Sequence, residues 1–243
     1  MADSSLPTII VPARLASSRL PRKLLADAGG MPLILRTAYR LQDQVPEYEL
    51  FFAVDGEELA EPLENAGFTT LSTDPNLPSG TDRIAQANQT LQRDVVLNVQ
   101  ADEPLVTRDH ILALTKAIFK KGADLATLAT PFLKQEDFTD PNQVKVVLDR
   151  SGFALMFSRS PIPYDREKGG QFNTLSLKHL GLYGYQKSFL EDFAKIPAGD
   201  LEDLEKLEQL RALENGKRIA VEIVAHGTIG VDTREDLDAI EFG

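Results

Sequence analysis

The chain has 243 residues, 42% hydrophobic and 26% charged, which is ordinary for a globular protein and unlike a fibrous or disordered one. Its net charge of −11 argues against nucleic acid as the main partner, because a phosphate backbone selects a net basic face. The absence of cysteine excludes disulfides, thiolate metal sites and cysteine nucleophiles. With no apolar run of about 18 residues and no signal-peptide pattern at the N-terminus, we expect a cytoplasmic protein without a membrane span.

Strands and helices alternate through the first half of the chain. Apolar runs predict strands over residues 8–13, 50–54, 69–72 and 94–99. Apolar residues at helical spacing predict helices over residues 32–42, 57–66, 81–91 and 109–120. Repeated strand–helix–strand units of this kind imply an α/β fold with a mostly parallel central sheet covered by helices.

The pattern changes near residue 125. Strands without long helices between them are predicted over residues 125–130, 144–149, 153–158 and 178–185, with a hairpin turn at 149–152. Residues 162–176 are polar and lack a clear period, so we expect a mobile loop over a site. The remaining elements are one leucine-rich helix over 201–215, strands over 219–224 and 228–231, and a terminal helix capped by Asp232 or Thr233.

Residues 14–23 form a cationic segment, Arg-Leu-Ala-Ser-Ser-Arg-Leu-Pro-Arg-Lys, on an otherwise acidic chain. The segment directly follows the first strand, and open α/β sheets bind ligands at the carboxyl ends of their strands. A triphosphate needs several fixed cations, so this segment is a candidate triphosphate site. The alternative is an ordinary solvated loop.

Carboxylates follow two of the predicted strands. Asp102 comes after the strand at 94–99, together with Gln100 and Glu103, and Asp232 comes after the strand at 228–231. Carboxylates at such positions can hold Mg²⁺, which prefers oxygen ligands and often bridges a protein carboxylate to a substrate phosphate. The alternatives are that Asp102 ends its strand or caps a helix and that Asp232 caps the terminal helix.

Three other segments have both a functional and a structural interpretation. Residues 78–83, Pro-Ser-Gly-Thr-Asp-Arg, can bind an anion or a base edge through the first N–H groups of a helix, or simply cap that helix. His179 and Tyr183 lie on one strand face with Gly181 between them, which suits a sugar-binding wall and a packed strand equally well. Glu208 and Gln209 lie in the leucine-rich helix, where an exposed helical face is the ordinary interpretation. The sequence contains neither a nucleophile elbow nor a P-loop.

Taken in order, eight motifs over nearly the whole chain resemble those of the 3-deoxy-manno-octulosonate (Kdo) cytidylyltransferases. They are Pro-Ala-Arg-Leu-Ala-Ser-Ser-Arg-Leu-Pro at 12–21, Ser-Gly-Thr-Asp-Arg at 79–83, Asn-Val-Gln-Ala-Asp-Glu-Pro at 98–104, Val-Lys-Val-Val-Leu-Asp at 144–149, Phe-Ser-Arg-Ser-Pro-Ile-Pro at 157–163, Lys-His-Leu-Gly-Leu-Tyr-Gly-Tyr at 178–185, Leu-Glu-Gln-Leu-Arg at 207–211 and Gly-Val-Asp-Thr at 230–233. Any one motif is weak evidence, but eight in the right order are specific.

The resemblance implies transfer of CMP from CTP to the anomeric 2-hydroxyl of Kdo, with release of pyrophosphate, for lipopolysaccharide biosynthesis. It implies a single domain over residues 1–243 with a Rossmann-like nucleotidyltransferase core. Residues 1–130 would be mainly the CTP-binding core, 131–200 a smaller sheet-rich region for sugar binding and homodimerisation, and 201–243 a return to the core.

The resemblance also assigns roles to individual residues. CTP would be bound by Arg14, Ser17, Arg19, Lys23, Ser79 and Arg83. The catalytic residues would be Arg14, Arg19, Lys23, Asp102 and Asp232, of which Asp102 and Asp232 would be the ligands of Mg²⁺. The sugar would be surrounded by Gln100, Arg159, His179, Tyr183, Glu208 and Gln209.

Two positions depart from the family pattern. Arg22 stands in Arg-Lys-Leu where the family usually has Gly-Lys-Pro, and Ala101 replaces the usual glycine before Asp102. Arg22 would either touch phosphate or face water, and Ala101 would alter the end of the strand unless its φ is negative. Two alternative functions remain: the same reaction on 8-amino-Kdo or a sialic acid, and a non-catalytic nucleotide-binding module.

Overall fold

The computed structural model describes residues 6–17, 19–193 and 195–242. The N-terminal residues 1–5, on which the expectation of no signal peptide rests, and Ser18 of the cationic segment lie outside the described residues. The chain forms two compact units: unit 1 comprises Met1–Ile111 and Thr228–Gly243, and unit 2 comprises Leu112–Gly227. Among the described helices, none has both the length and the apolar character needed to cross a membrane.

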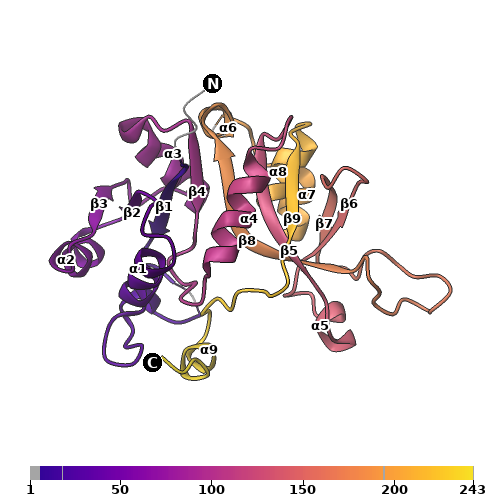
Figure 1. Ribbon diagram of the computed structural model, residues 1–243, viewed down its shortest axis with the longest axis horizontal. Coiled ribbons are helices and arrows are strands. Elements are labelled where there is room, and N and C mark those ends of the chain that lie inside the picture. Colours follow the sequence, from indigo (N-terminus) through magenta and orange to yellow (C-terminus); the bar gives the residue numbers. More distant parts are fainter. Residues whose placement is uncertain (1–5, 18, 194, 243) are drawn as a thin grey trace. The chain divides into compact units, whose positions relative to one another are not determined.

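Unit 1 contains four parallel strands in the order β3-β2-β1-β4 (Figure 1). Their bounds are β1 Thr8–Ala13, β2 Leu50–Val54, β3 Thr69–Ser72 and β4 Val95–Asn98. The helices of the unit are α1 Leu33–Gln44, α2 Glu57–Asn65, α3 Gly80–Leu91 and α9 Arg234–Asp238, with the short 3₁₀ helix η1 at Lys23–Leu25. All six residues of β1 are buried, as expected for a parallel strand covered on both faces.

Unit 2 is richer in antiparallel pairing. Strand β5 pairs antiparallel with β8 and parallel with β9, while β6 pairs antiparallel with β7 and β8. The bounds are β5 Leu125–Pro131, β6 Lys145–Leu148, β7 Ala154–Ser158, β8 Leu177–Gln186 and β9 Ile219–Ile223. The helices are α5 Gln135–Thr139, α6 Lys187–Phe193, α7 Asp200–Glu205 and α8 Gln209–Glu214, and α4 Arg108–Ile118 spans the boundary between the units.

The α/β class and the mostly parallel sheet are therefore confirmed. The assignment of separate roles to residues 1–130, 131–200 and 201–243 of a single domain stays a prediction. The two compact units divide at residues 111 and 227. The physical reason is strand pairing. Leu125 of β5 pairs with Ile219 of β9, which joins the chain after residue 200 to the sheet-rich unit.

Two element predictions are wrong. The single helix over 201–215 is two helices, because Lys206 between them has a left-handed backbone with φ of 53°. Residues 228–231 are not a strand, and the Val231 N–H instead donates a single hydrogen bond of 2.9 Å to the Asp102 carbonyl. The short helices α5 and α6 were not predicted.

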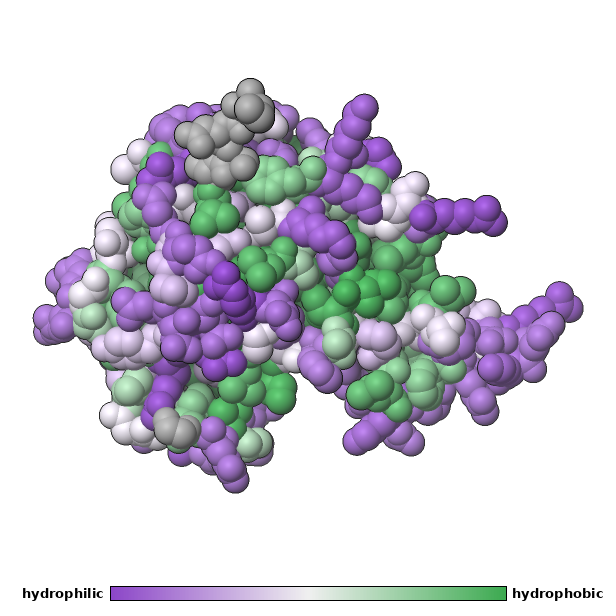
Figure 2. All heavy atoms as spheres, viewed as in Figure 1, coloured by the Kyte–Doolittle hydropathy of each residue, from purple (hydrophilic) through white to green (hydrophobic). Residues whose placement is uncertain are grey.

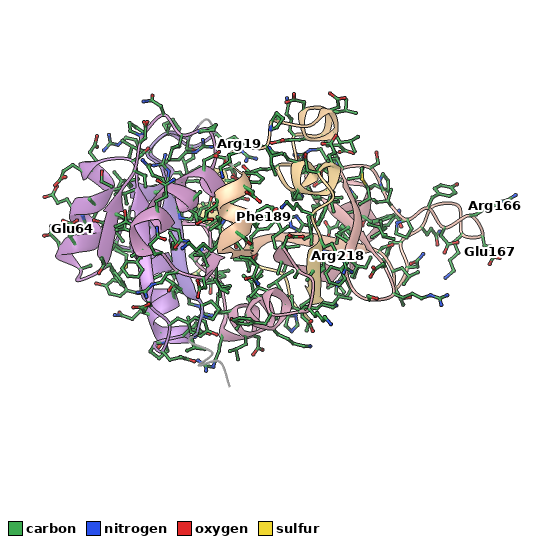
Figure 3. The ribbon with its side chains drawn as sticks, turned by 90° about the horizontal axis from the view of Figure 1, so that it is seen from above. Arg19, Glu64, Arg166, Glu167, Phe189 and Arg218 are labelled. Carbon is green, nitrogen blue, oxygen red and sulfur yellow. The ribbon has the colours of Figure 1, made fainter. Side chains whose placement is uncertain are left out.

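The predicted loop at residues 162–176 contains no helix or strand. It projects from the strands of unit 2 (Figure 1), and its surface is largely hydrophilic (Figure 2). Arg166 and Glu167 lie at its far end (Figure 3). The Asp165 carboxylate orders this end locally by accepting the N–H groups of Glu167 and Lys168 at 3.1 and 3.0 Å. An irregular polar loop is therefore confirmed, while its motion over a site stays a prediction.

The hairpin turn at residues 149–152 is also confirmed, and it depends on Gly152. The Gly152 N–H donates to the Asp149 carbonyl at 3.0 Å, and Gly152 adopts a φ of +75°. A side chain in this left-handed region costs about 1–2 kcal/mol.

We predict that Gly152→Ala lowers the free energy of unfolding by about 1–2 kcal/mol, because alanine cannot adopt this φ without strain. Gly181→Ala is the matched control, since a Cβ there meets no atom within 4 Å and the backbone is not left-handed. The control should change the free energy by less than about 0.5 kcal/mol. Urea unfolding of both variants measures the difference, and equal free energies would contradict the prediction.

Candidate active site

The cationic segment and the segment after β4 meet at one edge of the sheet of unit 1. Strands β1 and β4 are parallel neighbours, with Ile10 opposite Asn98, so the residues that follow them emerge side by side. They surround a cavity of about 210 Å³. Its lining residues are Pro12, Arg14, Ala16, Ser17, Arg19, Lys23, Leu24, Gln100, Ala101, Asp102 and Asp232. The structure thus brings seven of the predicted site residues to one cavity.

Lys23 is the central group of this cavity. It is buried, and its Nζ lies 2.5 Å from Asp102 Oδ2 and 3.2 Å from Asp232 Oδ1. The exposed Arg19 adds a second cation, with Nη2 at 2.9 Å from Asp232 Oδ1. Two carboxylates and two cations balance one another in charge, which explains how two acidic side chains can converge at this point.

Backbone contacts place Asp232 in the cavity. The hydrogen bond from Val231 N–H to the Asp102 carbonyl joins the two segments that carry the carboxylates. The Asp236 side chain then accepts the N–H groups of Asp232 and Thr233 at 3.0 and 2.8 Å. Because Thr233 accepts the N–H of Asp236 and caps helix α9, the Asp232 carboxylate is not the cap of that helix.

The donor set of this cavity fits Mg²⁺. Two carboxylate oxygens converge on the single Nζ of Lys23, so the side chains of Asp102 and Asp232 can also converge on one cation. No cluster of three or more His, Cys, Asp or Glu suited to a metal occurs in the described part of the chain. Two carboxylates leave positions for water and substrate phosphates, which is the usual arrangement for this ion.

Ser79 and Arg83, both predicted to bind CTP, do not line this cavity. Ser79 caps helix α3 by accepting the Asp82 N–H at 3.1 Å, and the next residue, Gly80, lies beside Pro12 and Gln100 at the cavity wall. Arg83 is buried and donates to the Thr73 hydroxyl. Burial lowers the pKa of Arg83, the negative charge of Asp55 opposes this, and the positive charge of Arg14 adds to it.

The two departures from the family pattern have different structural consequences. Ala101 is buried and is not among the residues with positive φ, so it replaces glycine without backbone strain. Arg22 has a left-handed backbone with φ of 54° and ψ of 34°, a conformation that glycine adopts more easily. Its side chain pairs with Glu58 at the start of helix α2.

In unit 2, His179 and Tyr183 belong to a continuous run of rings. His179 lies between Phe157 and Tyr183, with ring centroids 4.9 and 5.5 Å away, which confirms that His179 and Tyr183 share one face. The run continues through Tyr185, Phe189 and Phe193. A bulge in β8 opposite Thr127 and Leu128 accommodates this packing, and the Thr127 hydroxyl lies 2.9 Å from His179 Nε2.

This environment controls the protonation of both side chains. Burial lowers the pKa of His179 from 6.5 to about 3, so its ring is neutral at physiological pH. Burial also raises the pKa of Tyr183 well above its ordinary value, and the neighbouring Tyr185 and Glu208 add to this effect. Both side chains therefore present neutral hydrogen-bonding groups.

Arg159, predicted to bind the sugar, makes several contacts within the protein. Its Nε donates to the Glu205 carbonyl at 2.6 Å and its Nη1 to the Pro141 carbonyl at 2.9 Å. The backbone carbonyl of Arg159 accepts from Lys145 Nζ at 2.7 Å, and Lys145 is fully buried. Arg159 therefore has a clear structural role in holding the end of helix α7.

Glu208 and Gln209 begin helix α8. Gln209 is only 7% exposed, and its Nε2 has no hydrogen-bond partner among the described residues. A buried amide donor without a partner is costly, so this atom is suited to a ligand oxygen. The alternative interpretation, an exposed helical face, does not hold for Gln209, and its role in sugar binding stays a prediction.

Three residues that contact predicted site residues or the cationic segment were not identified from the sequence. Lys145 and Thr127 act through partners distant in the chain, which no local pattern reveals. Asp55 follows β2 and binds the start of the cationic segment, with Leu15 N–H at 3.1 and 2.9 Å from its two carboxylate oxygens. The sequence does contain an indication of this role, because Asp55 follows a strand just as Asp102 does. It was missed because Asp55-Gly56 resembles an ordinary turn.

A family model described as cytidylyltransferase matches residues 8–219. The chain belongs to the cytidylyltransferase family. Within this family it is 40% identical to the 3-deoxy-manno-octulosonate cytidylyltransferase of Thermodesulfovibrio yellowstonii, over 96% of this chain and 95% of that protein. It is 45% identical to the corresponding protein of Syntrophobacter fumaroxidans, over 95% of this chain and 94% of that protein.

Solved structures agree with this membership. A CMP:2-keto-3-deoxy-manno-octonic acid synthetase complexed with CTP is similar with a TM-score of 0.88 and 33% identity, covering 96% of this chain and 95% of that one. A glucose-1-phosphate thymidylyltransferase from Bacillus anthracis shares the fold, with a TM-score of 0.63 and 15% identity over 97% of each chain. The Rossmann-like nucleotidyltransferase core is therefore confirmed.

The low pKa of His179 predicts an acid-sensitive contribution to the stability of this cytidylyltransferase. As pH falls from 6.5 towards 3, the unfolded chain takes up a proton at His179 that the folded chain does not. The free energy of unfolding should therefore decrease over this window, by at most about 1.4 kcal/mol per pH unit from this residue.

We expect His179→Gln to show a shallower loss of stability than the wild type between pH 6.5 and 4.5 in urea unfolding. His226→Gln, at an exposed position, is the matched control for the removal of a histidine. Parallel curves for the wild type and His179→Gln would show that His179 accepts a proton equally well in the folded and unfolded chains.

Proposed function

We propose that this cytidylyltransferase transfers CMP from CTP to the anomeric 2-hydroxyl of Kdo and releases pyrophosphate. The observation that carries this proposal is the single cavity where Arg14, Ser17, Arg19 and Lys23 meet Gln100, Asp102 and Asp232. It combines fixed cations for a triphosphate with carboxylates for its metal. Relatives at 40–45% identity are named for this reaction, which supports Kdo as the acceptor.

The cations of the cavity bind the triphosphate and respond to the charge that moves during the reaction. The sugar hydroxyl oxygen forms a bond to the α-phosphorus while the bond from that phosphorus to the leaving pyrophosphate oxygen breaks. Negative charge grows on the pyrophosphate, and Arg14, Arg19 and Lys23 neutralise it. Ser17 contributes a hydroxyl to the same wall.

Asp102 and Asp232 would hold Mg²⁺ in this cavity. The ion, when bound, supplies a Lewis acid for the α-phosphate and lowers the pKa of the attacking hydroxyl. In this structure the two carboxylates form ion pairs with Lys23 and Arg19. On binding a metal ion, they would either keep these side chains as additional partners or release them. The proton of the hydroxyl leaves to solvent, and we assign no side chain as general base.

Ser79 and Arg83 contribute to cytidine binding in this proposal from positions next to the cavity. The first N–H groups of helix α3 follow Ser79, and Gly80 packs against Pro12 at the cavity wall. Such N–H groups suit a base edge or a phosphate. Arg83 acts from within the protein, by fixing Thr73 at the end of β3.

Gln100 borders the cavity of Lys23. Within unit 2, His179, Tyr183, Glu208 and Gln209 are proposed as sugar-binding groups. Gln209 Nε2, which has no hydrogen-bond partner among the described residues, and the neutral ring of His179 support this role. Some guanidinium N–H groups of Arg159 donate to carbonyl groups of the protein. Its proposed contact with the sugar therefore uses the remaining N–H groups. The loop at residues 162–176 would close over the bound sugar and exclude water.

We further propose a homodimer formed through unit 2, and action in the cytoplasm as a step of lipopolysaccharide biosynthesis. The support for a dimer is that unit 2 carries apolar side chains on its surface, with Leu133 83% exposed, Leu155 63% and Leu175 68%. Exposed apolar side chains mark contacts between proteins when they form a contiguous patch, which the proposed dimer requires of these leucines.

Asp102→Asn should lower kcat/KM by at least roughly 100-fold, because the amide loses the charge that holds the metal while keeping the shape of the side chain. Steady-state pyrophosphate release measures this loss, and circular dichroism verifies that the variant is folded. The matched control is Asp109→Asn at an exposed position of helix α4, which should retain wild-type turnover. Near-normal turnover by Asp102→Asn would exclude Asp102 as a metal ligand.

The acceptor is tested by pyrophosphate release from CTP and Mg²⁺ with Kdo, 8-amino-Kdo or a sialic acid. We expect the highest kcat/KM with Kdo. A preference for 8-amino-Kdo or a sialic acid would refute Kdo as the acceptor but keep the reaction class. No release with any of the three, despite CTP binding, would favour a non-catalytic nucleotide-binding module.

A further inference from the structure

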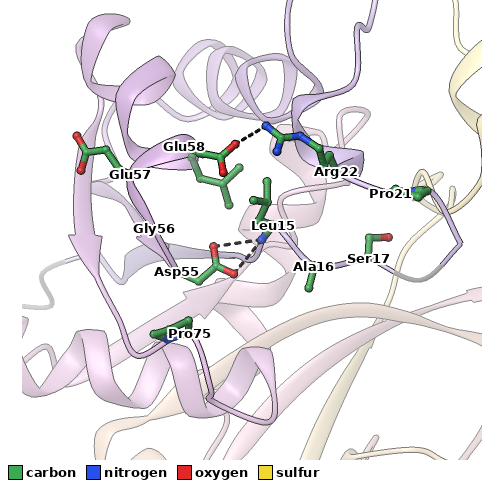
Figure 4. A pocket seen from close by; sticks show the side chains of 11 residues that line it. Leu15, Ala16, Ser17, Pro21, Arg22, Asp55, Gly56, Glu57, Glu58 and Pro75 are labelled. Carbon is green, nitrogen blue, oxygen red and sulfur yellow. Dashed lines mark hydrogen bonds and ion pairs between the residues drawn. The ribbon is translucent and has the colours of Figure 1, made fainter.

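The cationic segment is attached at one end to the turn after β2 and at the other end to the first turn of α2. At its start, the Leu15 N–H points between the two carboxylate oxygens of Asp55, at 3.1 and 2.9 Å. At its end, the Arg22 guanidinium pairs with Glu58 on the first turn of α2. Figure 4 shows both contacts, with the segment on one side of a second cavity and the turn on the other.

The two contacts differ in strength. Arg22 and Glu58 are 58% and 55% exposed, and exposed ion pairs contribute little to stability. The Asp55 contact joins a charged acceptor to a backbone donor in a less exposed place, which makes a stronger hydrogen bond. Any positioning effect of the turn therefore depends mainly on Asp55.

The position of Leu15 links the orientation of its backbone to that of Arg14. Its neighbours Arg14 and Ala16 both line the cavity that contains Lys23, whereas Leu15 lines the second cavity. The Leu15 N–H belongs to the peptide bond that joins it to Arg14. Fixing this N–H fixes the orientation of that peptide plane and limits the directions in which the Arg14 side chain can point.

The charge of Asp55 has a second effect. Arg14 and Arg83 are close enough for the charge of Arg14 to act on Arg83, and Asp55 attracts Arg83. Two neighbouring guanidinium groups repel one another, so a carboxylate near them lowers the cost of keeping Arg14 at the cavity.

We infer that Asp55 is a positioning residue for the triphosphate: its carboxylate binds the Leu15 N–H and thereby orients the cationic segment before the nucleotide arrives. This inference rests on the proposed function, because it assigns the triphosphate to that segment. Pre-orientation reduces the entropy lost on binding, so the effect should appear mainly in nucleotide affinity. Asp55 itself touches neither the reacting phosphorus nor the cavity of Lys23.

The test compares three substitutions in the full-length protein. Asp55→Ala removes the acceptor, and Asp55→Asn keeps an amide oxygen that can still accept the Leu15 N–H. Glu57→Gln is the matched control, because Glu57 lines the same second cavity but its carboxylate points away from the segment (Figure 4). For each, calorimetry gives the Kd of Mg²⁺–CTP without sugar, and pyrophosphate release gives KM and kcat.

We expect Asp55→Ala to raise the Kd and the KM for CTP by roughly tenfold, with kcat at saturating CTP changed by less than about threefold. Asp55→Asn should recover most of the affinity, and Glu57→Gln should match the wild type. An unchanged Kd in folded Asp55→Ala, or an Asp55→Asn variant as weak as Asp55→Ala, would overturn the inference.

A substitute variant and a separate assay distinguish failure of this inference from failure of the proposed function. Should Asp55→Ala not fold, Asp55→Glu takes its place: it keeps the charge but moves the oxygens, and an unchanged Kd would overturn the inference. Turnover of CTP and Kdo by the wild type tests the proposed function separately. A wild type that forms CMP-Kdo while Asp55→Ala retains full affinity would refute only the role of Asp55.

Discussion

The contact of one buried lysine with two carboxylates organises the candidate site. Lys23 Nζ lies 2.5 Å from Asp102 and 3.2 Å from Asp232, two residues separated by about half of the chain. Without a cation between them, the carboxylates would repel one another. The electrostatic balance at this point therefore requires the loop after β1, the segment after β4 and the segment before α9 to meet at one edge of the sheet.

Strand pairing and backbone hydrogen bonds bring these three segments together. Parallel pairing of β1 with β4 brings two carboxyl ends together, and one backbone hydrogen bond from Val231 to Asp102 adds the third segment. The turn after β2 binds the cationic segment from the opposite side through Asp55. Each of these contacts is made by backbone groups or a short carboxylate, so the meeting of the three segments depends little on flexible side chains. The position of the two carboxylates then depends on Lys23.

The sequence predicts the elements of unit 1 well because local patterns determine them. The bounds of β1, β2 and β3 coincide with the predicted ranges, and Asp102 was located by its place after a strand. The failures lie where distant contacts decide the local structure. Helix α7 ends at Glu205, where Lys206 adopts a left-handed backbone and Arg159, 46 residues earlier, binds the last carbonyl of the helix. The spacing of the leucines does not reveal either feature.

The same distinction applies to individual site residues. Charge and position identify Arg14, Arg19 and Lys23 as a group, but only the structure shows that Lys23 lies between the carboxylates. Arg22, which was expected either to touch phosphate or to face water, pairs with Glu58 and adopts a left-handed backbone. This conformation gives a physical reason for the usual family glycine at this position.

We propose that Asp102 and Asp232 would exchange Lys23 for a metal ion when the nucleotide binds. The most direct test is a crystal structure with CTP and Mn²⁺, in which anomalous scattering locates the ion. The account predicts one Mn²⁺ bound by both carboxylates and by a triphosphate oxygen, with Lys23 Nζ contacting phosphate. An ion located away from both carboxylates, with Lys23 still between them, would contradict it.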